Sequence, residues 1–384
     1  MPDQLSPELL DLRERVQRFI AEVLAPLEEQ AIGDEDGAGN TDLRKEVAAR
    51  SREAGFFGMT QPKEFGGSEA GPLALTVARE AFAASNLRTA SWVFGPGPGV
   101  LRQAEGRLRE EYLKPLMRGE RYAGWGFTEP SGADAGRPTW AVRDGDDLVV
   151  NGRKAYVSGG SSADFYAVLL NVDEDASGPG GTAMVVIDRA TPGVELGDDF
   201  VSVDGSSHCQ VMFHDARVPQ SNVVGRIGEG LQRGLGNIGQ MRLGMAARAT
   251  GIAIWATEHT KAHITAPHRH GGSLYDREQV RWIFGNMIME TFAARSVLYR
   301  TARLAETGVD VQNEGSIAKV LSTETAGRVV DAAIQLSGGQ ALIVGHPLER
   351  LYRQVRTMRL AEGASDLLRL NLARGMVEFE AGRL

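Results

Sequence analysis

The chain has 384 residues, of which 42% are hydrophobic and 24% charged, and its formal net charge is −8. This length allows two or three domains around a large core, and the negative charge argues against nucleic acid or an anionic membrane as a main partner. The single cysteine, Cys209, excludes an internal disulfide and fits a reducing compartment. The sequence shows no signal peptide and no apolar run of the roughly 20 residues needed to cross a bilayer. We therefore expect a soluble, cytoplasmic protein.

The first 120 residues predict a helical domain. Ser6, Pro7 and Glu8 form a helix start, with a capping serine and a proline at the first helical position. Apolar residues then recur at helical spacing from position 9 to position 24. Further helices are predicted over residues 41–55, 72–82 and 107–117.

Residues 121–226 differ in composition, because short β-type runs alternate there with Gly, Asp and Ser. The predicted strands cover residues 140–143, 148–151, 154–157, 165–170, 182–187 and 209–213. Together they predict a small antiparallel β domain. From 227 to 384 the pattern is helical again, with long periodic segments over 229–263, 277–306, 311–336 and 366–379. Four long helices with short connections indicate an antiparallel bundle.

Glu362 is the candidate for chemistry. It lies among apolar and small residues and is followed by Gly363, where the backbone can turn without a Cβ penalty. Ser365 and Asp366 are plausible caps for the helix that follows. A carboxylate in apolar surroundings loses hydration, so its pKa rises and it becomes a proton acceptor near neutral pH. The alternative is a solvated glutamate that precedes a surface helix.

Five motifs give this region a context. Residues 126–134 read Gly-Phe-Thr-Glu-Pro-Ser-Gly-Ala-Asp and residues 151–160 read Asn-Gly-Arg-Lys-Ala-Tyr-Val-Ser-Gly-Gly. Residues 335–339 read Gln-Leu-Ser-Gly-Gly, residues 353–356 read Arg-Gln-Val-Arg, and Glu-Gly stands at 362–363. In order and spacing, these motifs resemble those of acyl-CoA dehydrogenases over essentially the whole chain.

The resemblance implies a mostly α fold with an N-terminal helical domain (1–120), a middle antiparallel β-barrel (121–226) and a C-terminal four-helix bundle (227–384). It implies FAD between the last two domains and a homodimer or homotetramer. The implied reaction is α,β-dehydrogenation of an acyl-CoA thioester to the trans-2-enoyl thioester in fatty acid metabolism. Electrons would then pass to an electron-transferring flavoprotein.

By this resemblance, Glu362 is the base that removes the α-proton, and flavin N5 accepts the hydride. The thioester carbonyl would be bound by the backbone N–H of Glu362 and a ribityl hydroxyl, with Arg242 and Gly363 at the substrate. An ordinary helix–helix ion pair is the alternative for Arg242. Some family members take the base from a position that matches Met241, which cannot accept a proton.

The resemblance also implies a set of cofactor contacts. Those near the isoalloxazine ring are Phe127, Thr128, Tyr156 and Ser158, and packing in the core or at an interface is the alternative for the tyrosine. Those at the adenosine-diphosphate end, commonly given by a neighbouring subunit, are Gln335, Gly338 and Gly339. A helix C-cap is compatible with the two glycines as well.

A histidine cluster (His259, His263, His268 and His270) allows a metal hypothesis. It lacks a His-Glu-x-x-His pattern and a nearby cysteine, so no metal is expected. The family instead has an arginine here that reaches the FAD pyrophosphate. Arg269 is the candidate for that role and His268 the second choice, although the phenylalanine of the family's Arg-x-x-Phe-Gly context is missing.

Three departures from the family pattern leave the carrier open. The loop 131–134 is one residue short, Gly239 stands where several members have an aspartate that bonds the pantetheine arm, and Gln354 replaces the aspartate of Arg-Asp-x-Arg. CoA is the default carrier and an acyl-carrier protein the alternative. Rival functions are a flavin oxidase or monooxygenase on the same fold, and a flavin-binding homologue that binds nucleic acid. The retained Glu-Gly pair disfavours the first rival and the acidic charge disfavours the second.

Overall fold

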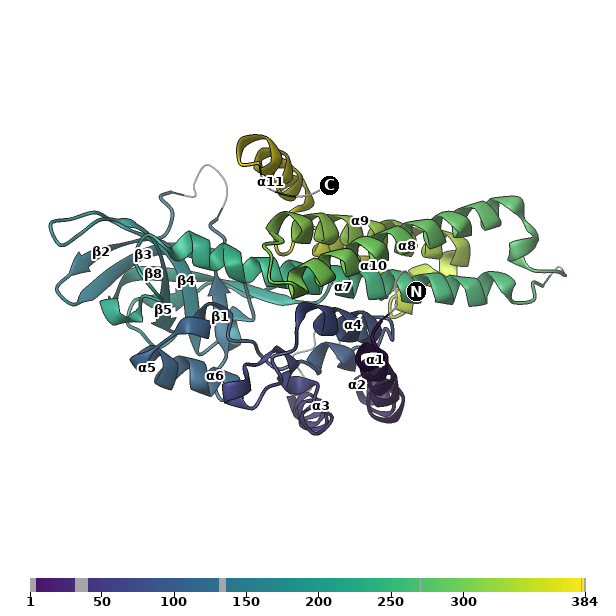
Figure 1. Cartoon of the computed structure of the whole chain (residues 1–384), viewed down its shortest axis with the longest axis horizontal. Coiled ribbons are helices and arrows are strands. Elements are labelled where there is room, and N and C mark those ends of the chain that lie inside the picture. Colours follow the sequence, from purple (N-terminus) through teal and green to yellow (C-terminus); the bar gives the residue numbers. More distant parts are fainter. Residues whose placement is uncertain (1–4, 32–40, 131–135, 270, 381, 383–384) are drawn as a thin grey trace.

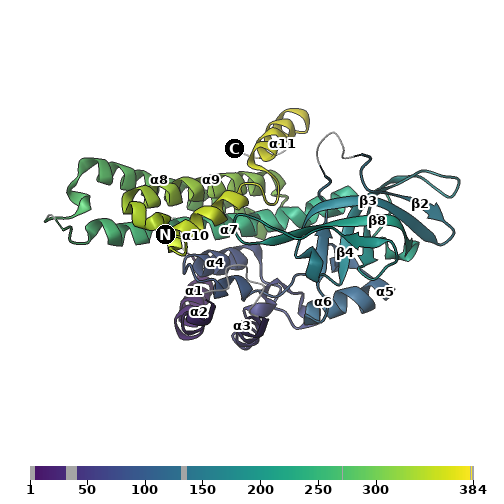
Figure 2. The same cartoon turned by 180° about the vertical axis from the view of Figure 1, so that it is seen from behind.

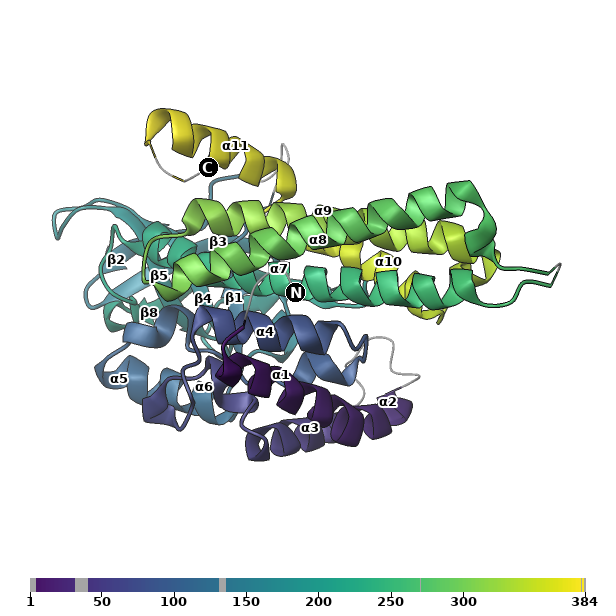
Figure 3. The same cartoon turned by 45° about the vertical axis from the view of Figure 1, so that its right-hand side comes forward.

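The computed structural model describes residues 5–31, 41–130, 136–269, 271–380 and 382. A β-sheet lies at one end of the molecule, and long helices extend from it as a bundle (Figures 1 and 2). The N-terminal helices pack along one side of the bundle next to the sheet (Figure 3). This order of helical, β and helical parts confirms the predicted fold class.

The N-terminal helices begin and end close to the predicted positions. They are α1 (Pro7–Phe19), which continues through a wider turn (Ile20–Leu24) into α2 (Ala25–Ala31), then α3 (Thr41–Glu53), α4 (Pro72–Ala83) and α5 (Gly106–Leu108), which continues through a second wider turn (Arg109–Leu113) into α6 (Lys114–Arg118). The apolar stripes of α1 to α4 meet in one buried cluster. Glu80 of α4 ties this layer to the bundle, because its carboxylate accepts hydrogen bonds from Arg295 (2.7 Å) and Tyr299 (2.9 Å).

The strands of the middle region form one curled sheet. They are β1 (Ala123–Gly126), β2 (Trp140–Asp144), β3 (Asp147–Ser158), β4 (Phe165–Val172), β5 (Gly181–Asp188), β6 (Val194–Leu196), β7 (Phe200–Val201) and β8 (Ser207–Pro219). The order is β1-β4-β2-β3-β8-β6, with β5 beside β4 and β7 beside β8. β4 pairs in parallel with both β1 and β2, so the sheet is mixed and not wholly antiparallel.

The predicted strands over 148–151 and 154–157 are in fact one strand, β3. Gly152, at φ +125°, lies where the pairing of β3 with β8 shifts register. A glycine takes such a backbone at little cost, so the strand bulges and continues where the pattern suggested a break.

The bundle consists of α7 (Gly230–Thr265), α8 (Glu278–Glu306), α9 (Gln312–Ser337) and α10 (Pro347–Met358). The prediction that the last helix, α11 (Ser365–Glu378), completes the bundle was wrong. α11 lies apart on the outer side of α9 (Figures 1 and 3), whereas Leu348, Leu351, Val355 and Met358 of α10 are buried in the bundle core. Their spacing is helical, and Pro347 starts the helix.

No helix in the described ranges is both long and apolar enough to cross a membrane.

Alanine substitutions can test which helix completes the core. Leu351 of α10 is 1% exposed, whereas Leu370 of α11 is 69% exposed. Leu351→Ala should lower the free energy of unfolding by about 2–5 kcal/mol because it leaves a cavity. Leu370→Ala, the matched control, should change it by about 0.5 kcal/mol or less. Denaturant unfolding measures both, and equal effects would contradict the assignment of α10 to the core.

Candidate active site

Glu362 lies in a tight turn between α10 and α11. Its backbone is left-handed (φ +57°), and Gly363 follows at φ +102°. The bend was therefore predicted correctly. A left-handed non-glycine residue costs roughly 1–3 kcal/mol and persists only where its surroundings hold it. The predicted caps were wrong, because α11 begins at Ser365 with Ala364 as the capping residue.

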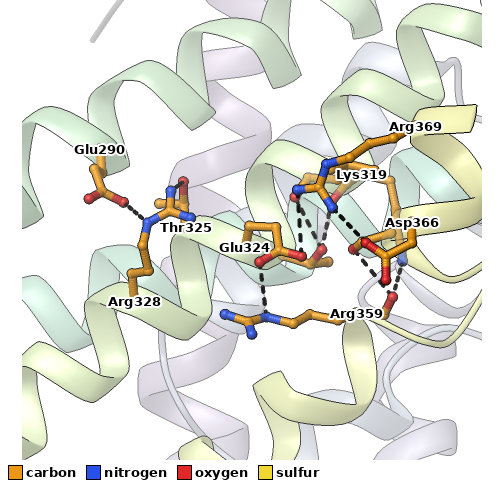
Figure 4. Close-up of polar contacts among 11 residues, drawn as sticks. Glu290, Lys319, Glu324, Thr325, Arg328, Arg359, Asp366 and Arg369 are labelled. Atoms are coloured by element: carbon orange, nitrogen blue, oxygen red, sulfur yellow. Dashed lines mark hydrogen bonds and ion pairs between the residues drawn. The ribbon is translucent and has the colours of Figure 1, made fainter. Parts of the chain in front are cut away.

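Two buried cations hold the turn by its carbonyl oxygens. Arg242 of α7 donates from Nε to the carbonyl oxygen of Glu362 (3.1 Å) and from Nη1 to the hydroxyl of Ser316 (3.2 Å). Lys319 of α9 donates from Nζ to the carbonyl oxygens of Arg359 (3.1 Å) and Gly363 (2.8 Å), and Figure 4 shows it beside Arg359. Charge-assisted bonds of this kind are stronger than neutral ones, so they can stabilise the left-handed backbone.

The electrostatics favour proton exchange at Glu362. Burial raises the pKa of its carboxyl above the usual 4.5, and the nearby charges of Arg242 and Lys319 offset only part of that rise. The backbone N–H of Glu362 has no assigned acceptor among the described residues. The turn therefore offers a proton acceptor and a backbone donor side by side.

Two of the predicted flavin contacts, Tyr156 and Ser158, are exposed two residues apart on β3 and so share one face of the sheet, and Thr128 lies beside them. The backbone N–H of Ala155 donates to the carbonyl oxygen of Thr128 (2.9 Å), which joins the segment after β1 to β3. Tyr156 has a left-handed backbone (φ +55°) and is 60% exposed, with its ring edge-to-face against Phe200 at 5.6 Å. Phe127 lies nearby along the chain, stacked on Trp125 at 5.7 Å.

This face fits a planar aromatic group such as a flavin. Tyr156 supplies an accessible aromatic surface, and the exposed Thr128 and Ser158 supply hydroxyl groups. Tyr156 does not pack in the core of this chain, so the core alternative for it is wrong.

A hydrogen-bonded chain that the sequence analysis missed connects this face to the bundle. Ser158 Oγ lies 3.1 Å from His208 Nδ1, and His208 Nε2 lies 3.0 Å from Ser206 Oγ. Asp204 accepts from Ser206 (2.6 Å) and from Thr357 of α10 (2.7 Å). This series of hydrogen bonds thus ends at Thr357 of α10, just ahead of the turn that carries Glu362. Burial raises the pKa of Asp204, but these hydrogen bonds outweigh burial and lower it.

The remaining predicted cofactor residues lie elsewhere. Gln335 is at the end of α9, Gly338 (φ +74°) and Gly339 follow it, and Arg269 is in the connection between α7 and α8. That end of the bundle lies far from the sheet (Figures 1 and 3). One chain therefore does not bring these residues together with Thr128, Tyr156 and Ser158.

The histidines at that end form no recognisable metal site. No cluster of three or more His, Cys, Asp or Glu side chains in the described part of the chain is arranged to hold a metal ion. His259 stacks on Trp255 at 4.7 Å and meets the ring of His346 at 6.1 Å. Burial lowers the pKa of His259. His270 and the shortened loop 131–134 lie outside the described residues.

Three models of one family match the chain in order. They are the acyl-CoA dehydrogenase N-terminal domain over residues 6–120, the middle domain over 124–216 and the C-terminal domain over 228–377. The chain belongs to the acyl-CoA dehydrogenase family. It is accordingly an oxidoreductase.

Individual relatives span nearly the same length. A 3-(aryl)acrylate reductase of Clostridium sporogenes is 28% identical, over 94% of this chain and 97% of its own. A subunit of the caffeyl-CoA reductase–Etf complex of Acetobacterium woodii is 26% identical, over 85% of this chain and 88% of its own. The crystal structure of a probable acyl-CoA dehydrogenase from Mycobacterium abscessus is similar, with a TM-score of 0.84 and 27% sequence identity. The match covers 97% of the present chain and 99% of the Mycobacterium chain.

The raised pKa of Glu362 predicts how stability depends on pH. A carboxyl whose folded-state pKa lies above its unfolded value stabilises the fold below the unfolded pKa, and this contribution is lost as the pH rises through the folded pKa. Glutamine does not titrate. The unfolding free energy of Glu362→Gln, relative to the native sequence, should therefore rise with pH.

Denaturant unfolding of both proteins at a series of pH values measures this difference. Asp204→Asn is the control of opposite sign, because the pKa of Asp204 is lowered. That variant should lose stability relative to the native sequence as the pH rises. A pH-independent difference for Glu362→Gln would contradict the raised pKa.

Proposed function

We propose that this protein catalyses flavin-dependent α,β-dehydrogenation of an acyl-CoA thioester to the trans-2-enoyl-CoA, with Glu362 as the base. The observation that carries the proposal is the carboxyl of Glu362, which burial makes a better proton acceptor and which the left-handed turn fixes in position. The chain of hydrogen bonds from Ser158 to Thr357 supports a shared site, because it joins the flavin-type face of the sheet to the end of α10.

The residues of the turn carry the proton chemistry. The carboxylate of Glu362 accepts the α-proton of the acyl group. Its backbone N–H, next to Gly363, donates to the thioester oxygen as negative charge grows there. When bound, FAD would supply the acceptor for the β-hydrogen, which would leave as a hydride. Loss of both hydrogens would leave a carbon–carbon double bond in the product and the α-proton on Glu362. Arg242 serves the substrate indirectly, because its guanidinium holds the carbonyl of Glu362.

The cofactor contacts follow from the two ends of the molecule. Phe127, Thr128, Tyr156 and Ser158 would hold the ring, and Arg269, Gln335, Gly338 and Gly339 would hold the adenosine-diphosphate end. Their separation within one chain supports a homodimer or homotetramer in which a neighbouring copy supplies the second set. We further propose CoA as carrier, an electron-transferring flavoprotein as electron acceptor and a cytoplasmic role in fatty acid metabolism. A relative named as part of a reductase–Etf complex supports the second point.

Reduction of an α,β-unsaturated acyl group is the second candidate. Two relatives at 26–28% identity are named reductases. The same residues can serve that direction, since a protonated Glu362 can return its proton to the α-carbon.

An anaerobic titration tests the proposal. Purified yellow protein should bleach with its preferred member of an acyl-CoA panel, and a panel of enoyl-CoAs added to the reduced protein tests the reverse direction. Glu362→Gln should keep the flavin and bind the ligand but bleach about 10²–10⁴-fold more slowly, because a general base is lost. Asp366→Asn, an exposed carboxylate on the next helix, is the matched control and should bleach normally.

Bleaching of Glu362→Gln at the native rate would remove Glu362 from its role. Rapid reaction of the substrate-reduced flavin with air would favour the oxidase alternative. Bleaching by acyl-carrier-protein thioesters and not by acyl-CoAs would change the carrier.

A further inference from the structure

Lys319 is a buried cation that is directed at a turn. It lies on α9 with 0% of its surface exposed. Burying an ammonium group is costly unless it is given partners. Among the described residues no carboxylate forms an ion pair with it, and its two hydrogen bonds go to the carbonyl oxygens of Arg359 and Gly363.

These two carbonyl groups bracket Glu362. α10 has ended at Met358, so the carbonyls of the turn cannot be satisfied by further helical bonds. The carbonyl oxygen of Arg359 also accepts from the backbone N–H of Ser365 (2.9 Å), which closes the turn. One ammonium group therefore pins the backbone on both sides of Glu362.

We propose that Lys319 is a positioning residue for Glu362: its ammonium group fixes the turn from Arg359 to Gly363, and its positive charge favours the ionised, proton-accepting form of the base. This proposal deepens the proposed function and rests on Glu362 being the base. The second cation, Arg242, holds the carbonyl of Glu362 itself from another helix.

The charges around Lys319 support this role. Burial, together with the nearby charge of Arg242, lowers the pKa of Lys319 to about 8, although the charges of Glu362 and Glu324 act in the opposite direction. Lys319 therefore carries its charge at neutral pH. Arg359, also beside it, pairs with Glu324 at 3.3 Å (Figure 4).

A purely structural role would have a different signature. If Lys319 only joined α9 to the turn, its loss would lower stability and leave the proton affinity of Glu362 unchanged. Thr250→Val is the matched control for this role. It removes a buried hydrogen bond that joins α9 to a different element, α7, from Thr250 to Ser322 (3.2 Å), without changing any charge.

The test compares pH profiles of bleaching by acyl-CoA in the flavin-loaded protein. Lys319→Met should move the acid limb to higher pH by about one unit or more, because a cation near a carboxylate stabilises its charged form. At pH values below the acid limbs of both proteins, this shift makes bleaching of Lys319→Met about tenfold slower, or more, than bleaching of the native protein. Lys319→Arg should restore the native limb, and Thr250→Val should leave it in place.

A second readout needs no substrate. The carboxyl infrared band of Glu362 can be assigned by its absence in Glu362→Gln. This band is titrated in the native protein and in Lys319→Gln, a milder variant that keeps an N–H donor group. The band should convert to carboxylate at higher pH in Lys319→Gln. Equal titration curves would overturn the proposal, as would an unchanged acid limb in Lys319→Met. If no thioester bleaches the native protein, the proposed function fails, and the infrared titration still decides the role of Lys319.

Discussion

Two buried cations direct their hydrogen bonds to the carbonyl oxygens of one turn, and the arrangement of the molecule follows from that constraint. Arg242 comes from α7 and Lys319 from α9, so the turn can form only when these long helices are packed side by side. The burial of the two cations is tolerable because the carbonyls at the end of α10 carry partial negative charge. Fold and site therefore depend on each other.

The periodic helices could be predicted from sequence, because their apolar spacing is set by burial against one neighbour. α10 was not predicted, because it is short and its apolar residues are interleaved with arginines, although Leu348, Leu351 and Val355 lie at helical spacing. α11 was placed in the core on a similar stripe, yet it packs outside. Apolar periodicity predicts a helix, but it does not say which neighbour the helix meets. The domain boundaries at 120/121 and 226/227 stay predictions.

The site was predictable only in part. Glu362 and the bend at Gly363 follow from local sequence, since a glycine after an acidic residue indicates a turn. Ser158 and His208 face each other because β3 pairs with β8 across a shifted register, which no local pattern reveals. Lys319 gave no signal either, since most lysines are solvated. Its role depends on contacts with residues about forty positions further along the chain.

The left-handed backbone at residue 362 places conformational strain on the residue proposed as the base. Glycine and asparagine adopt that conformation with less strain, and neither has an acidic group that resists burial. A library selected only for survival at high temperature would therefore enrich replacements at this position. With the proposed base gone, the recovered proteins would be more stable but inactive, so laboratory evolution of this scaffold needs an activity screen in every round.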